Sequence, residues 1–300
     1  MKNEMFNTGL VIAYFGDRVE VEADNGDIIA CYLHRNRETP VVGDQVTWRY
    51  ENDNKGVIEA IQPRRTLLAK PDYRGKLKPI AANIDVICII MAPPPVLSEY
   101  LIDRYLIAAT LLKLQPIIVL NKMDLLTEKN RADTLARLQI YQAIGCAVVM
   151  TSVTTGEGLP ALLGQLQQKN SVLVGPSGVG KSSIIATVTA TAIRVGALSA
   201  SGAGKHTTTA VRLYHLANDA NLIDSPGIRD FNLWPISKTE LASGFAELQP
   251  FARDCRFRNC QHQSEPDCAV LQAVADNKIS AARLASYLRL LTECKEKKWR

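Results

Sequence analysis

The pattern of apolar and polar residues changes near residue 65. Before that point the chain has the alternation of short strands: Val19–Glu22 alternates strictly, and Asp24–Asp27 has the composition of a tight turn ahead of Ile28–Leu33. Two further apolar runs follow glycines. Five short strands within residues 9–61 predict a small β-barrel, of the OB type or of another topology that periodicity does not distinguish.

Beyond residue 80, short apolar runs alternate with helical stretches. Strands are expected at Val86–Met91, Ile117–Leu120, Ala147–Met150, Ser171–Val174, Val211–Leu216 and Asn221–Ile223. Helices are expected at 98–114, 128–144 and 159–167. This alternation is typical of a parallel α/β sheet. The strand pattern stops near residue 235, and residues 269–298 are expected to be largely helical.

These changes predict four parts. They are an OB-like β-barrel at 1–65, a basic linker at 66–80, an α/β domain at 81–235 and a C-terminal helical domain at 236–300. The formal net charge of +5 is uneven, because residues 1–65 carry 8 basic and 11 acidic side chains whereas residues 66–80 carry 4 and 1. A modest basic excess fits nucleic-acid contact, and it fits a mixed solvated surface equally well.

The composition is that of an ordinary globular protein, with 47% hydrophobic and 22% charged residues. No apolar run approaches the ~20 residues that span a bilayer. The N-terminus lacks the basic and apolar regions of a secretory signal. We therefore expect a cytoplasmic protein with no membrane partner.

The clearest chemical motif is Gly175–Ser182, which matches the P-loop pattern G-x-x-x-x-G-K-[ST] between an expected strand and helix. Glycines let successive backbone N–H groups face phosphate oxygens, and the following helix directs its positive end at the same charge. Lys181 is expected to reach the β- and γ-phosphates, and Ser182 to bind Mg²⁺. The predicted nucleotide-binding residues of this loop are Gly175, Pro176, Ser177, Gly178, Val179, Gly180, Lys181, Ser182 and Ser183.

Two loops earlier in the chain predict a preference for guanine. Asn121-Lys122-Met123-Asp124 follows a strand directly, at the sheet edge where ligands bind. The Asp124 carboxylate can accept from both N1–H and the exocyclic amine of guanine, whereas adenine offers no such pair of donors. The next strand is followed by Ser152 and Val153, where a backbone N–H can reach guanine O6.

Two later segments have the pattern of nucleotide-sensing switches. Asp224-Ser225-Pro226-Gly227 has D-x-x-G spacing, with Asp224 expected near Mg²⁺ and Gly227 near the γ-phosphate. In the threonine run at 207–209, Thr208 is the first choice as a Mg²⁺ ligand when GTP is bound. Ile228 follows Gly227 and cannot orient water, so His206 is the candidate catalytic group beside Lys181. Packing of His206 within the loop is an equally good interpretation.

The C-terminal part contains a metal-ligand pattern. Cys255, Cys260, His262 and Cys268 supply three sulfurs and one imidazole within fourteen residues, which is a complete tetrahedral Cys₃His set for structural zinc. No ligand position is left for water, so a catalytic zinc is not expected. Basic and aromatic residues between these ligands suggest contact with RNA.

Together these motifs resemble the circularly permuted bacterial GTPases that act with the small ribosomal subunit, the ribosome small-subunit-dependent GTPase A family. The base motif at Asn121–Asp124 precedes the P-loop, and the barrel, switches and Cys₃His set occur in the order of that family. The resemblance implies a permuted α/β GTPase domain between an OB-like barrel and a zinc domain. It also implies Mg²⁺ with GTP, one Zn²⁺, rRNA contact and subunit-stimulated GTP hydrolysis late in subunit maturation. We expect a monomer.

Two alternatives are kept. One is an ATP-using P-loop enzyme such as a small kinase, and the other is a zinc-stabilised RNA-binding protein whose nucleotide is only structural. Neither accounts for both the base motif Asn121–Asp124 and the ordered switch motifs.

Overall fold

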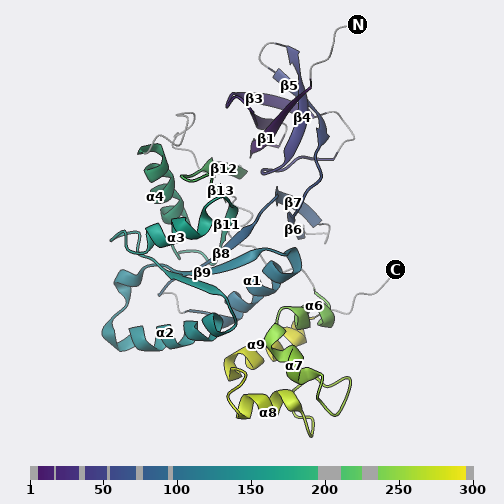
Figure 1. Ribbon diagram of the computed structural model, residues 1–300, viewed down its shortest axis with the longest axis vertical. Coiled ribbons are helices and arrows are strands. Elements are labelled where there is room, and N and C mark those ends of the chain that lie inside the picture. Colours follow the sequence, from purple (N-terminus) through teal and green to yellow (C-terminus); the bar gives the residue numbers. More distant parts are fainter. Residues whose placement is uncertain are drawn as a thin grey trace.

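Figure 1 shows the computed structural model of the chain, in which a barrel, a layered α/β unit and a small helical unit follow one another. The structure describes residues 6–16, 18–33, 38–52, 55–71, 77–93, 97–194, 211–224 and 236–294.

The N-terminal unit is a five-stranded barrel. Its strands are β1 (Asn7–Tyr14), β2 (Val19–Ala23), β3 (Ile28–Leu33), β4 (Gln45–Asn52) and β5 (Lys55–Ile61). The pairing order β1-β2-β3-β5-β4 closes through a further β1–β4 pairing. Val11, Val21, Val46 and Trp48 are buried inside, and the residues on either side of Val21, Val46 and Trp48 are more exposed. The alternation that predicted strands thus also fills the barrel.

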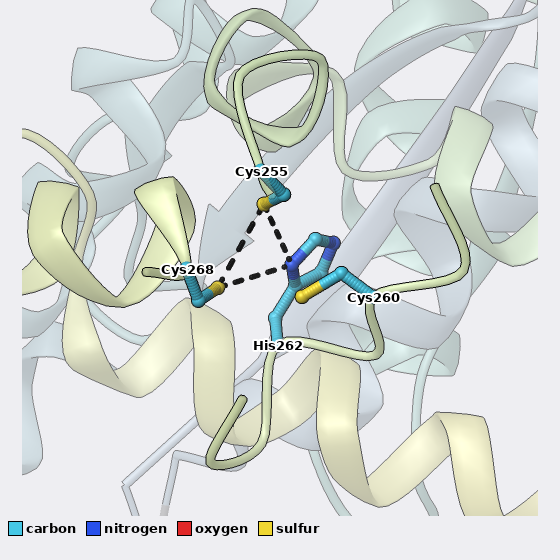
Figure 2. A group of neighbouring side chains, drawn as sticks. All are labelled: Cys255, Cys260, His262 and Cys268. Carbon is cyan, nitrogen blue, oxygen red and sulfur yellow. Dashed lines mark hydrogen bonds between the residues drawn. The ribbon is translucent and has the colours of Figure 1, made fainter. Parts of the chain in front are cut away.

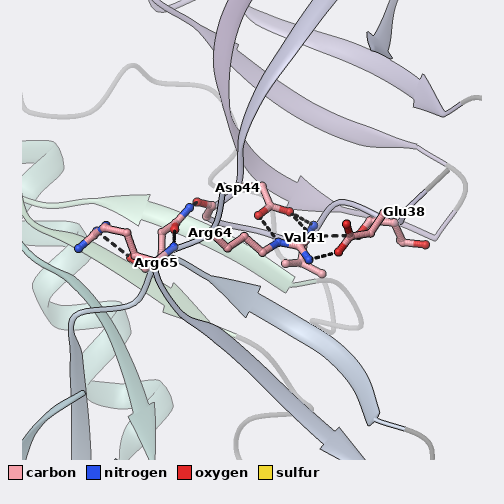
Figure 3. Close-up of polar contacts among 8 residues, drawn as sticks. Glu38, Val41, Asp44, Arg64 and Arg65 are labelled. Atoms are coloured by element: carbon pink, nitrogen blue, oxygen red, sulfur yellow. Dashed lines mark hydrogen bonds and ion pairs between the residues drawn. The ribbon is translucent and has the colours of Figure 1, made fainter. Parts of the chain in front are cut away.

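Residues 66–80, predicted as a linker, contain most of an antiparallel hairpin. Strand β6 (Leu67–Pro71) pairs with β7 (Leu77–Ala82). At its base Arg64 donates two hydrogen bonds of 2.7 Å to the fully buried Asp44 carboxylate, as Figure 3 shows. Gly43 lies against Ala82 with a φ of 92°, where any Cβ would overlap the Ala82 carbonyl. The barrel and hairpin therefore form a buried joint, which we call the anchor.

The central unit is a six-stranded sheet in the order β10-β9-β8-β11-β13-β12. The strands are β8 (Val86–Met91), β9 (Gln115–Leu120), β10 (Ala147–Met150), β11 (Asn170–Val174), β12 (Val211–His215) and β13 (Asn221–Asp224). Neighbours are parallel except β12, which runs antiparallel to β13 and also pairs with β1 of the barrel. The two sheets are continuous at that edge.

Helices cover both faces of this sheet. They are α1 (Glu99–Leu112), α2 (Glu128–Ala143), α3 (Leu159–Leu166) and α4 (Lys181–Arg194), with a short 3-10 turn η1 at Met123–Leu125. The fully buried β8 alternates between the faces: Ile87 and Ile89 share a core with α1 and α2, whereas Cys88 and Ile90 share one with α3 and α4. The P-loop strand β11 pairs with β8, in the interior of the sheet.

The C-terminal unit is helical in its described residues. Its elements are α6 (Lys238–Ser243), η2 (Ala246–Leu248), α7 (Gln249–Ala252), α8 (Ala269–Ala275) and α9 (Ala281–Glu293). Ile107 of α1 belongs to its hydrophobic core, and Arg283 of α9 pairs with the fully buried Asp103 of α1. The C-terminal unit is thus attached to the central sheet through α1. None of the helices in the described part of the chain has the length and apolar character needed to cross a membrane.

Candidate functional site

The predicted phosphate loop lies between β11 and α4. Lys181 is the first residue of α4 and is only 6% exposed. Its Nζ donates to the carbonyl oxygens of Gly175 at 2.6 Å and Pro176 at 2.7 Å. The loop thus curls around its own ammonium group, which places a positive charge beside the N-terminus of α4. Phosphate oxygens would meet both at once.

The predicted base loop contacts the phosphate loop directly. Asn121 follows β9, and its Nδ2 donates to the Val179 carbonyl at 2.9 Å. Lys122 Nζ donates to the Gly178 carbonyl at 2.6 Å. Gly180 adopts a φ of 96°, and a Cβ there would overlap the Asn121 amide. The structure therefore brings together two motifs that lie more than fifty positions apart in the chain, and only glycine fits at their contact.

The second base loop follows β10 on the same sheet edge. Ser152 is buried, and its hydroxyl donates to Asp124 Oδ1 at 2.5 Å, while the Asp124 residue itself is exposed. Thr151 is also buried and donates to Asn121 Oδ1 at 3.2 Å. The contact of Thr151 was missed from the sequence, although its place at the carboxyl end of a strand was a usable signal.

A cavity of about 400 Å³ opens where these loops meet. It is lined by Lys122, Ser177, Gly178, Gly180, Lys181, Ser182 and Ser183. Backbone groups, three hydroxyls and two ammonium groups are the chemistry that holds a polyphosphate. Asp124, Ser152 and the half-buried Val153 lie outside this lining.

Of the predicted switch residues, the structure describes Asp224. It ends β13, is 6% exposed, and lies one strand away from β11, whose end leads into the phosphate loop. Thr208, His206 and Gly227 lie outside the described residues, so their predicted roles stay predictions.

The four predicted metal ligands converge in the C-terminal unit, as Figure 2 shows. Their ligand atoms all lie within 4.8 Å of one another. The Cys255 and Cys268 sulfurs are 3.8 Å apart, and His262 Nδ1 lies 3.6 and 3.4 Å from them. Zn–S bonds of about 2.3 Å at tetrahedral angles separate two sulfurs by roughly 3.8 Å, so these distances fit one shared ion. Burial lowers the pKa of His262, which favours the neutral imidazole that binds metal.

The loop that carries the ligands has little regular structure of its own. Residues 253–268 form turns between α7 and α8. His262 has a left-handed φ of 62°, which is unfavourable for a side-chain-bearing residue. The half-buried Glu265 accepts hydrogen bonds from the backbone N–H groups of Gln261 and Gln263 through its carboxylate, each at 2.8 Å. These bonds hold the pKa of Glu265 down at about 2.

Comparison with known proteins agrees with this geometry. A family model described as RsgA GTPase matches residues 61–234. The small ribosomal subunit biogenesis GTPase RsgA of Pseudomonas aeruginosa is 46% identical over 291 residues, which cover 96% of this chain and 86% of that protein. The protein of the same name from Haemophilus influenzae is 44% identical over 296 residues, covering 97% and 86%.

Solved structures of similar chains have the same fold. The crystal structure of YjeQ from Thermotoga maritima superimposes with a TM-score of 0.79 at 30% identity, covering 96% of this chain and 98% of that one. The structure of YloQ, a circularly permuted GTPase, gives 0.76 at 30% identity, covering 100% and 99%. The permuted order of base loop and phosphate loop is therefore shared by relatives of known structure, and this chain belongs to the RsgA GTPase family and is a GTP hydrolase.

Proposed function

We propose that this chain hydrolyses GTP to GDP and phosphate while bound to the small ribosomal subunit, late in the maturation of that subunit. The relatives from Pseudomonas and Haemophilus are named as GTPases of small ribosomal subunit biogenesis, which supports this proposal. The observation that supports a single GTP site is the pair of hydrogen bonds from Asn121 and Lys122 to the phosphate loop. These bonds hold the guanine-type motif beside the phosphate motif, which supports their sharing one nucleotide.

In the proposed complex the guanine base lies against Lys122, and Asp124 accepts from its N1–H and exocyclic amine. Ser152 orients that carboxylate through the 2.5 Å bond, and the backbone at Val153 faces O6. Lys181 leaves the two loop carbonyls for the β- and γ-phosphates. Ser182 and Asp224 would hold Mg²⁺, which supplies charge neutralisation on the phosphates.

The remaining roles are proposed from the sequence. Thr208 and Gly227 respond to the γ-phosphate, and His206 stabilises charge or orients water in place of the aliphatic Ile228. A GTPase that lacks its own water-orienting side chain turns over slowly until a partner completes the site. This reasoning supports stimulation by the subunit.

The flanking units are proposed to contact rRNA, with the Cys₃His cluster holding one structural Zn²⁺. We further propose a cytoplasmic monomer, and keep the division at residues 65, 80 and 235 as a prediction.

GTP turnover with and without purified small subunits tests the main proposal. We expect multiple-turnover hydrolysis to rise at least about tenfold, since partner-supplied groups contribute 10³ or more in related chemistry. Equal rates with and without subunits would contradict the role on the ribosome.

Asp124→Asn sharpens the test of base recognition. The amide can accept from N1–H and donate to the C2 carbonyl of xanthine, but it cannot accept from the guanine amine. The variant should lose affinity for GDP by about 1–3 kcal/mol and gain affinity for XDP. Asp133→Asn, on the exposed side of α2, is the matched control and should change neither. An Asp124→Asn protein that keeps its GDP affinity, or a wild type that prefers ADP, would favour the ATP-using alternative.

A further inference from the structure

The barrel is joined to its neighbours at two places that differ in burial, the anchor at the hairpin β6–β7 and a second joint at the α/β sheet. The anchor is buried: the Asp44 side chain is 0% exposed and the Arg64 side chain 11%. The second joint is the pairing of Ala13 and Tyr14 in β1 with Arg212 and Val211 in β12. We call this pairing, together with the side chains that cross it, the seam.

Among the described residues, two ion-pair contacts cross the seam, and the Arg212 guanidinium also lies 5.9 Å from the centroid of the Phe15 ring. His215 Nε2 lies 2.7 Å from Glu22 Oε2, and Arg212 lies 3.6 Å from Glu20 Oε2. These four side chains are 19–34% exposed. Ion pairs of this exposure contribute little net stability, whereas breaking a buried pair is costly. The seam is therefore the weaker of the two joints, and its backbone pairing links β1 to β12.

The seam also lies beside β13, the strand that ends at the predicted switch residue Asp224. Arg212 is the direct register partner of Asp224 across β12 and β13. The same Arg212 pairs with Ala13 of the barrel. Arg212 is thus the single backbone position between the barrel and Asp224, whose carboxylate is predicted to lie near Mg²⁺. In the sequence, Val211 comes three positions after Thr208, the predicted Mg²⁺ ligand.

We propose that the seam is a coupling joint through which the barrel and the nucleotide site change one another's conformational equilibrium. In Figure 1, β12 lies between β13 and β1 of the barrel, and it pairs with both. A shift of β13 that moves Asp224 toward or away from Mg²⁺ would therefore also shift β12 and, through it, β1 at the edge of the barrel. Conversely, a partner that holds the barrel fixes β12 and with it the position of Asp224. Coupling between two sites is reciprocal, so both directions must have the same free energy.

This proposal rests on the proposed function for the identity of the partner, the small subunit. Reciprocity makes a test without subunits possible. Hydrogen–deuterium exchange of β1 and β2 peptides should differ between GDP and a non-hydrolysable GTP analogue in the wild type, by about fivefold or more in exchange rate. Equal exchange in the two nucleotides would overturn the proposal.

Glu20→Ala with Glu22→Ala removes both carboxylates that contact β12 across the seam and leaves the residues of the nucleotide site unchanged. In this double variant the nucleotide-dependent difference in exchange should disappear. Hydrolysis without subunits should stay within about twofold of wild type, whereas stimulation by subunits should fall about fivefold or more. Glu20→Gln with Glu22→Gln keeps amide oxygens as acceptors and should restore part of both responses.

Glu59→Ala is the matched control. Glu59 lies within the barrel, accepts from Arg49 at 2.8 Å, and its side chain is 19% exposed, the same as Glu22. It should lower barrel stability as much as a seam substitution, yet keep the exchange difference and the stimulation. If Glu59→Ala loses both responses, or the seam variant keeps both, the seam is only structural. If the wild type is not stimulated by subunits, the proposed function fails, and the exchange measurement still decides the seam.

Discussion

The nucleotide site and the Cys₃His cluster solve the same problem, the convergence of distant side chains, in opposite ways. The nucleotide loops extend from buried parallel strands, and their amides and ammonium groups already bond to carbonyl oxygens of the phosphate loop. The cluster has three of its four ligands in the turns 255–262, between the four-residue helix α7 and α8. The first site is organised by the sheet, whereas the organisation of the second would depend on an ion held by its four ligands.

This difference assigns different consequences to the loss of each ligand. An empty nucleotide site should keep its shape, because Lys181 has carbonyl partners without phosphate. A metal-free cluster leaves three thiols and an imidazole close together with no common partner, at a His262 backbone conformation that is unfavourable in itself.

The largest expected effect is therefore that of metal removal. Zinc binding to such sets is worth ~10–16 kcal/mol at neutral pH, so chelation or Cys268→Ser should abolish the cooperative unfolding of the C-terminal unit. Affinity for GDP should stay within a few-fold, because the sheet organises that site. Calorimetry of the loaded and chelated protein, with GDP titrations of both, measures the two quantities.

Cys294→Ser is the matched control for Cys268→Ser. Cys294 is a half-buried thiol of the same unit, outside the cluster. It should leave the metal content at one ion per chain. A chelated protein whose C-terminal unit unfolds at the same temperature as the loaded one would remove the contrast between the two sites.

The sequence predicted strand β8 of the central sheet well because every residue of it is buried, which gives an unbroken apolar run: Val86–Met91 has the same bounds in the pattern and in the structure. The edge strand Ala147–Met150 also has the predicted bounds, although it is less buried. The four candidate metal ligands could be predicted because they all lie within one short segment of the sequence.

Features that depend on distant partners could not be found in this way. The hairpin β6–β7 has prolines and lysines that obscure its alternation, and it was assigned to a linker. Arg64 lies just before the predicted linker, and its guanidinium donates to the carboxylate of Asp44, twenty positions earlier in the chain. The seam joins β1 to a strand about two hundred positions later, and no local pattern records such a pairing.

The next largest effect tests the nucleotide side of the comparison. Asn121→Ala removes the bond to the Val179 carbonyl and leaves the buried Thr151 hydroxyl without its acceptor. An unsatisfied buried group costs about 1–3 kcal/mol, so GDP affinity should fall about tenfold to a hundredfold. Asn25→Ala, whose amide bonds within an exposed barrel turn, should leave GDP affinity unchanged. Calorimetric titration of both variants decides. Wild-type affinity in Asn121→Ala would mean that the sheet alone holds the loops.

The smallest effect concerns how much the hydrogen bonds of Glu265, in addition to the metal ligands, organise the loop 253–268. Backbone N–H groups of Gln261 and Gln263 lower the pKa of Glu265 from 4.5 to about 2, because they stabilise the carboxylate. A lowered folded pKa gives stability that is fully present above about pH 4.5 and is lost as pH falls toward about 2.

The side-chain carbon resonance of Glu265 should therefore show an ionised carboxylate down to pH 4.5 and below. Glu265→Gln should lower the melting temperature of the metal-loaded protein slightly at neutral pH, and the gap to wild type should narrow in acid. Asp267→Asn, in the same loop and paired with Arg256, is the control that keeps the Glu265 bonds. If Glu265→Gln instead unfolds the unit as completely as Cys268→Ser, the carboxylate and not the metal is what organises this loop.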